Sequence, residues 1–205
     1  MNTTGGGMTG SLRAAAWPLV LGGALMLSGC ISFGKKPPPT LLDLTPAQAA
    51  AAGAGAQGTA DQAIAVMVPD APLKLDVTQV PVQVNASTVA YLKGAVWVEK
   101  PAQLFARLIT ETIRAKGTRL VIDGLDARYR AATKLSGQLV EMGYDAPSGS
   151  VVVTFDAVLQ QPDGQIRTQR FENRVAGVAP TAAAVAPALN QAANQVAAAV
   201  AAWVG

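Results

Sequence analysis

The chain has 205 residues, and half of them are hydrophobic, with alanine alone accounting for 40. It contains no histidine and a single cysteine, which excludes Ser-His-Asp and Cys-His catalysis, histidine-ligated metal sites and an intrachain disulfide framework. The net charge of +3 comes from scattered side chains, without the basic stripe or aromatic platforms of proteins that bind nucleic acid.

The N-terminal residues have the pattern of an export signal. Arg13 is the only charged residue before position 35, and residues 14–27 form an almost wholly apolar run that Pro18 interrupts. A short positive region followed by such a run is typical of a secretory signal peptide. The run is also shorter than the roughly 20 residues that a membrane-spanning helix needs. We therefore predict a signal peptide rather than a transmembrane anchor.

Residues 27–30, Leu-Ser-Gly-Cys, resemble the bacterial lipobox. In such signals the cysteine is acylated, and cleavage between Gly29 and Cys30 leaves the cysteine as the first residue. Two or three acyl chains form a lasting membrane anchor, and they consume a thiol that would otherwise be unpaired in an oxidising compartment. Ile31 stands where the inner-membrane retention signal has an aspartate. We therefore expect a lipoprotein of a Gram-negative envelope, on the outer membrane and facing the periplasm.

These features divide the chain into three parts. Residues 1–29 are the predicted lipoprotein signal peptide, and residues 30–40 hold the lipidated cysteine and a flexible proline-rich tether. Residues 41–205 form the folded domain. Within it, residues 46–60 consist of small and polar residues, which predicts a mobile loop.

Two patterns that suggest a cofactor or a catalytic site have simpler explanations. Residues 53–58 match G-x-G-x-x-G, but an alanine tract stands where a dinucleotide-binding fold needs a strand. Asp123 and Asp126 could hold a cation, yet aspartates at the end of a strand usually form turns. We expect no cofactor, no metal and no enzymatic activity.

The apolar patterns predict one α/β domain. Pro101 suits the first turn of a helix over residues 101–116, and Gly117 suits the position after its end. An alanine-rich helix is predicted within residues 181–204, beginning near Pro187 and carrying Trp203 on its apolar stripe. Strands are predicted at residues 41–44, 63–68, 77–84, 88–98, 119–122, 135–144, 151–160 and 165–175, with a hairpin turn at 161–164.

Large aromatic residues are rare in this chain, so Tyr91 and Trp97 are the candidates for a partner interface. Val96 and Val98 flank Trp97 in the alternation of a strand, of which one side faces the interior. This alternation favours a core position for Trp97, while an interface position stays open.

The stretch Tyr-Leu-Lys-Gly-Ala-Val-Trp at residues 91–97 leads into the amphipathic helix. Together with residues 64–69 and 80–84, it resembles the ABC-type transport auxiliary lipoprotein family of the paraquat-inducible protein C type. The resemblance runs from about residue 41 to residue 203. Val96 replaces an arginine that is common in that family, so no role of that arginine is carried over.

The resemblance implies a mixed β-sheet flanked by helices and an accessory role in moving lipids between the inner and outer membranes. The implied partners are a mammalian-cell-entry (MCE) protein with its ABC permease and ATPase, and a homo-oligomer is possible. ATP hydrolysis would then belong to a separate subunit, since this chain has no P-loop. Two alternatives stay open, namely a domain that carries lipid itself and an outer-membrane lipoprotein that activates a cell-wall synthase.

Overall fold

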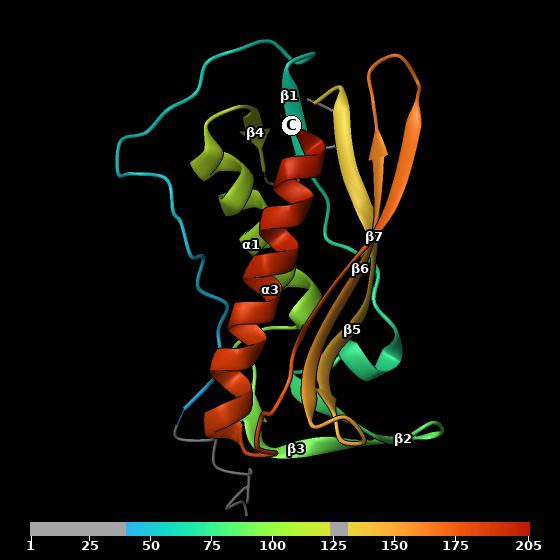
Figure 1. The fold of residues 1–205 in the computed structure, drawn as a ribbon. Coiled ribbons are helices and arrows are strands. Elements are labelled where there is room, and N and C mark those ends of the chain that lie inside the picture. The colour runs from blue at the N-terminus through green and yellow to red at the C-terminus, as the bar shows by residue number, and fades with distance from the viewer. Residues whose placement is uncertain (1–39, 124–130) are drawn as a thin grey trace, which may run out of the picture. The chain divides into compact units, whose positions relative to one another are not determined.

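The computed structural model describes residues 40–123 and 131–205, so the predicted signal peptide, Cys30 and most of the tether lie outside the described residues. Within the described residues, seven strands, two long helices and one short 3₁₀ helix follow one another (Figure 1). In order they are β1 (Ala63–Val66), η1 (Leu73–Leu75), β2 (Gln79–Asn85), β3 (Thr88–Val96), α1 (Pro101–Lys116), β4 (Leu120–Ile122), β5 (Thr133–Asp145), β6 (Ser150–Gln160), β7 (Ile166–Val175) and α3 (Ala182–Val204).

The long strand β5 organises a mixed sheet. One edge of β5 pairs antiparallel with β6 along its whole length, and β6 pairs antiparallel with β7. The other edge is shared by two parallel neighbours, β1 beside residues 133–135 and β2 beside residues 144–145. β4 extends the sheet beyond β1, and β3 extends it beyond β2. The prediction of an α/β domain with a mixed sheet is confirmed.

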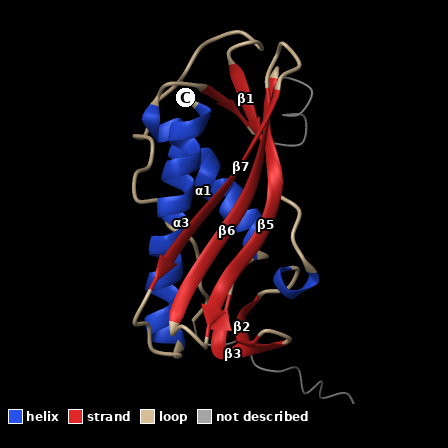
Figure 2. Cartoon of the chain, turned by 45° about the vertical axis from the view of Figure 1, so that its right-hand side comes forward, coloured by secondary structure: helices blue, strands red, loops and turns tan. Residues whose placement is uncertain are grey.

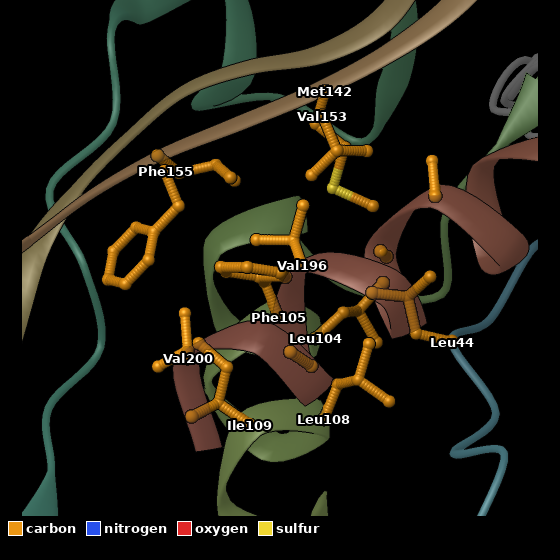
Figure 3. Close-up of a cluster of buried hydrophobic side chains, with 14 of the residues drawn as sticks. Leu44, Leu104, Phe105, Leu108, Ile109, Met142, Val153, Phe155, Val196 and Val200 are labelled. Carbon is orange, nitrogen blue, oxygen red and sulfur yellow. The ribbon is translucent and has the colours of Figure 1, made fainter. Parts of the chain in front are cut away.

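Both helices lie against the same face of the sheet, where they pack on each other and enclose the main core (Figure 2). The side chains of Leu104 and Phe105 on α1 face the strand residues Met142 and Phe155 (Figure 3). The rings of Phe105 and Phe155 meet edge to face, with their centroids 5.3 Å apart. The opposite face of β5, β6 and β7 is polar, and neither α1 nor α3 covers it.

Local signals set the bounds of α1 as predicted. Pro101 opens the helix, where its missing N–H costs no hydrogen bond, and the helix ends at Lys116. Gly117 follows with φ +68°, a left-handed conformation that glycine adopts without strain. The apolar face of the helix is buried at Leu104, Phe105, Leu108, Ile109 and Ile113.

The prediction for the second helix is wrong at its start. α3 begins at Ala182, five residues before Pro187, because the Thr181 side chain accepts a hydrogen bond from the Ala184 N–H (3.3 Å) and caps the first turn. Pro187 is therefore inside the helix, and Val185 before it is fully buried. Trp203 is half-buried, and its ring meets Phe171 edge to face.

Residues 41–44 form no regular strand, contrary to the prediction. Only Leu42 pairs with the sheet, through an isolated parallel bridge to Trp97. The segment that follows is held instead by side chains of the two helices: Asn194 accepts from the Ala47 N–H (2.7 Å), and Glu111 accepts from the Ala50 N–H (2.7 Å). Residues 51–60 are exposed throughout.

Candidate functional site

The structure separates the two candidate interface residues. Trp97 is 2% exposed and belongs to the main core, whereas Tyr91 is 41% exposed. Their positions differ by six, so regular alternation would place both side chains on one face of a strand. The register between β2 and β3 shifts between these positions, where Gly94 adopts φ +77°. This irregularity turns Trp97 inward and leaves Tyr91 on the outer face.

Trp97 also carries a polar group without a partner. Its indole N–H is buried and finds no hydrogen-bond acceptor among the described residues. A buried donor that stays unpaired costs about 1–3 kcal/mol. The apolar contacts of the ring therefore have to outweigh this cost.

A corner pocket of about 440 Å³ opens on the polar face of the sheet, where β2 leaves the edge of β5. Charged side chains from three separate elements meet there as ion pairs. Lys74 of η1 pairs with Glu141 of β5, and Arg174 of β7 lies 3.9 Å from Asp145 at the end of β5. The pocket is therefore lined by balanced charges that already satisfy one another.

The polar face next to the corner pocket carries two perturbed carboxylates. Arg170 donates two hydrogen bonds of 2.6 Å to Asp156, and they lower the pKa of that carboxyl. Hydrogen bonds from Arg174 (2.7 Å) and the Thr154 hydroxyl (3.0 Å) likewise lower the pKa of Glu172. Both carboxylates are stabilised in the charged state, which suits a structural ion pair and not proton transfer.

A second hollow of about 740 Å³, the helix groove, runs between α1, the end of β1 and the segment around residues 44–46. Its floor includes Leu44 and Ala106, which are buried. Arg114 donates to Glu111 and to Asp123, each at 2.9 Å, and the bond to Asp123 raises the pKa of the guanidinium. The groove thus combines an apolar floor with a paired, charged rim.

Of the other sequence candidates that the structure describes, Asp123 alone borders one of these hollows. Asp123 is on the groove rim as the ion-pair partner of Arg114, while Asp126 lies outside the described residues. The glycines of residues 53–58 are in the exposed segment before β1 and open no helix. Across residues 40–123 and 131–205, no group of three or more His, Cys, Asp and Glu side chains could hold a metal ion. Within these same residues, no helix has the length and apolarity to cross a membrane.

Comparison with protein families gives one match, over residues 41–201, to the ABC-type transport auxiliary lipoprotein component. The chain belongs to this family. The match covers the whole described domain up to the last turn of α3, which confirms the resemblance to the ABC-type transport auxiliary lipoprotein family. The protein is thus a lipoprotein of the cell envelope and an auxiliary component of an ABC-type transport system. No curated protein matches the chain.

Two solved structures support the fold of this auxiliary lipoprotein, those with TM-scores of 0.61 and 0.60. Protein XCC0632 from Xanthomonas campestris is 19% identical with a TM-score of 0.61, and the alignment covers 81% of this chain and 92% of that chain. An uncharacterized protein is 15% identical with a TM-score of 0.60, covering 72% of this chain and 95% of that chain. A PelC dodecamer from Paraburkholderia phytofirmans is also 15% identical, with a TM-score of 0.38 and coverage of 72% and 91%.

The sequence did not reveal the corner pocket. Its ion pairs join residues of η1, β5 and β7 that are 67 positions apart for Lys74 and Glu141 and 29 for Asp145 and Arg174, and no local spacing connects them. The helix groove could have been found from one signal in the sequence, because the charges at Arg107, Glu111 and Arg114 fall on the polar side of a helix with a clear apolar stripe.

Proposed function

We propose that this auxiliary lipoprotein is the non-catalytic, outer-membrane component of an MCE-type ABC system that moves lipids between the inner and outer membranes. The family match over residues 41–201 is the observation that carries the proposal. The lipobox at residues 27–30 supports an anchor at Cys30, and Ile31 supports sorting to the outer membrane. The domain would then meet the periplasmic end of an MCE protein whose permease and ATPase belong to other chains.

The packing of α3 argues against the domain as a lipid carrier. A carrier needs an apolar cavity, and the small side chains of the alanine-rich helix could have lined one. Ala192, Ala193, Ala197 and Ala201 are instead almost fully buried in the main core between the sheet and α1. Both hollows described above are open surface features with ion pairs at their margins.

Lipidation is tested first, by metabolic labelling with a fatty-acid analogue. Wild-type protein should incorporate the label, and the Cys30→Ser variant should not, because the acceptor thiol is missing. Label that persists on the Cys30→Ser protein would contradict the anchor.

The transport partner is tested by affinity purification of the full-length lipidated protein from membranes solubilised in a mild detergent. An MCE protein should co-purify together with its permease and ATPase, as identified by mass spectrometry. Recovery of a cell-wall synthase without these subunits would favour the alternative role. The Cys30→Ser protein is the matched control, since it has the same domain without the predicted anchor.

A further inference from the structure

We propose that the outer face of β3 lies against the membrane that holds the Cys30 lipid, so that the domain has a second, non-covalent contact with the lipid surface. The proposal rests on the lipid anchor of the proposed function. The contact surface, which we call the tether-side face, consists of four exposed apolar residues: Leu41, Val89, Tyr91 and Val98.

The strand register places these residues on one face. Pro81 pairs with Tyr91 and Gln79 pairs with Val96, so Tyr91 and Val96 point the same way. Val89 and Val98 follow at steps of two. Trp97 points the opposite way into the core, and Leu42 pairs with it in parallel, which leaves Leu41 on the outer side beside Val96.

Exposed apolar side chains are concentrated at this end of the domain. Leu41 is 48% exposed, Val98 42%, Tyr91 41% and Val89 39%. Scattered single apolar residues are normal on a protein surface, but a group on one sheet face marks an interaction site. Tyrosine is enriched at membrane–water interfaces, where its ring meets apolar groups and its hydroxyl stays in water.

The chain's own connection identifies the occupant. The described chain begins at Thr40, directly before the tether-side face and at the same end of the domain as β3 (Figure 1). Only ten residues, 31–40, separate Cys30 from Leu41. Even fully extended they span about 35 Å, so the lipid anchor keeps this face close to the bilayer.

Basic side chains close to the tether-side face favour an anionic lipid surface. Lys35 and Lys36 lie in the short connection, and Lys93 is exposed two positions after Tyr91. Lysines beside an anionic membrane surface each add about 1 kcal/mol of attraction, and apolar side chains next to them enter the headgroup boundary. Their combination is typical of a peripheral membrane contact.

The test uses the full-length lipidated protein in vesicles of phosphatidylethanolamine and phosphatidylglycerol. Half of the vesicles also contain a lipid with a nitroxide in its headgroup region, which quenches a nearby fluorophore. The acylated Cys30 has no free thiol, so an environment-sensitive fluorophore reacts only at an introduced cysteine. Val89→Cys places the probe on the tether-side face. Asp163→Cys places it in the β6–β7 turn at the opposite end of the domain and is the control (Figure 1).

We expect the nitroxide lipid to quench the probe at position 89 several-fold more strongly than the probe at position 163. Equal quenching at the two positions would overturn the proposal. A probe at position 89 that is shielded from water but not quenched by the nitroxide lipid would also overturn the proposal if dilution of the protein exposes it. In that case a second copy of the chain would cover the face. Quenching at position 89 that disappears when the purified transport partner is added would assign the face to that partner and also overturn the proposal.

A charge-insertion variant separates this inference from the anchor. Val89→Glu with Tyr91→Glu should keep the melting temperature and the acylation of Cys30 but abolish preferential quenching of a probe at Val98→Cys. Unchanged quenching would contradict a direct lipid contact. Loss of acylation in the wild-type chain would refute the anchor itself, and fatty-acid labelling detects that failure independently of the fluorescence.

Discussion

Gly143 of β5 lies directly beside the backbone of Pro81 in β2. A Cβ atom at position 143 would be 2.5 Å from the Pro81 carbonyl oxygen and 2.9 Å from its ring. β2 and β5 pair only at Val82–Tyr144 and Gln83–Asp145, so this close approach is next to their entire hydrogen-bonded contact. The absence of a side chain at position 143 is what lets the β2–β3 hairpin join the sheet at this corner.

Replacing Gly143 by alanine should therefore destabilise the domain. We expect Gly143→Ala to lower the free energy of unfolding by about 1–3 kcal/mol, since backbone atoms cannot yield as a flexible side chain does. Urea unfolding of the two proteins measures the difference. Gly55→Ala is the control, because a Cβ at position 55 meets no atom within 4 Å. Equal midpoints for wild type and Gly143→Ala would contradict the proximity of Pro81.

Trp97 can be tested with two substitutions of different size. Trp97→Ala should cost about 3–5 kcal/mol, because the largest buried side chain of the core is removed. Trp97→Phe should cost well under that amount, since phenylalanine keeps much of the packing and removes the indole N–H that lacks an acceptor. Thermal unfolding of the three proteins gives the ranking. A Trp97→Phe protein as unstable as Trp97→Ala would show that the indole N–H has a stabilising partner.

The segment at residues 45–50 should loosen when Asn194 is replaced. The Asn194 amide accepts from Ala47 (2.7 Å) and donates to the Thr45 carbonyl (2.9 Å), so it bonds the segment twice. Asn194→Ala should cost about 1–2 kcal/mol and increase hydrogen exchange at Ala47. Gln195→Ala, at the exposed next position on α3, is the matched control. Unchanged exchange at Ala47 would refute the contact.

The Asp156–Arg170 pair predicts a specific response to acid. Hydrogen bonds from Arg170 lower the pKa of Asp156 below its ordinary value of 3.8. A carboxyl with a lowered folded-state pKa stabilises the fold above its unfolded-state pKa and loses this contribution as the pH falls through the folded-state pKa. Wild-type protein should therefore exceed Asp156→Asn in stability at neutral pH, and the difference should shrink below pH 3.8.

Unfolding measured from pH 7 down to pH 2 tests this dependence. Asp61→Asn, an exposed aspartate outside the sheet, should follow the wild-type curve. A difference between wild type and Asp156→Asn that stays constant with pH would contradict the ion pair as its cause.

Local chemistry was sufficient to predict several parts of this protein from its sequence. Pro101 and Gly117 set the bounds of α1, because a proline start and a left-handed glycine act on adjacent backbone groups. The turn at residues 161–164 likewise joins β6 and β7 as predicted, with the Gly164 N–H bonded to the Gln161 carbonyl (3.0 Å). The family resemblance also depended on short contiguous stretches, and the match over residues 41–201 confirmed it.

Tertiary structure alone decided the features that depend on distant residues. Strand alternation assigns Tyr91 and Trp97 to one face, and the register shift around Gly94 places them on opposite faces. The pairing of β1 and β2 with the same edge of β5 depends on the length of β5 and on a glycine opposite Pro81. A sequence pattern records the preferences of neighbouring residues, whereas these contacts form between segments that only the folded chain brings together.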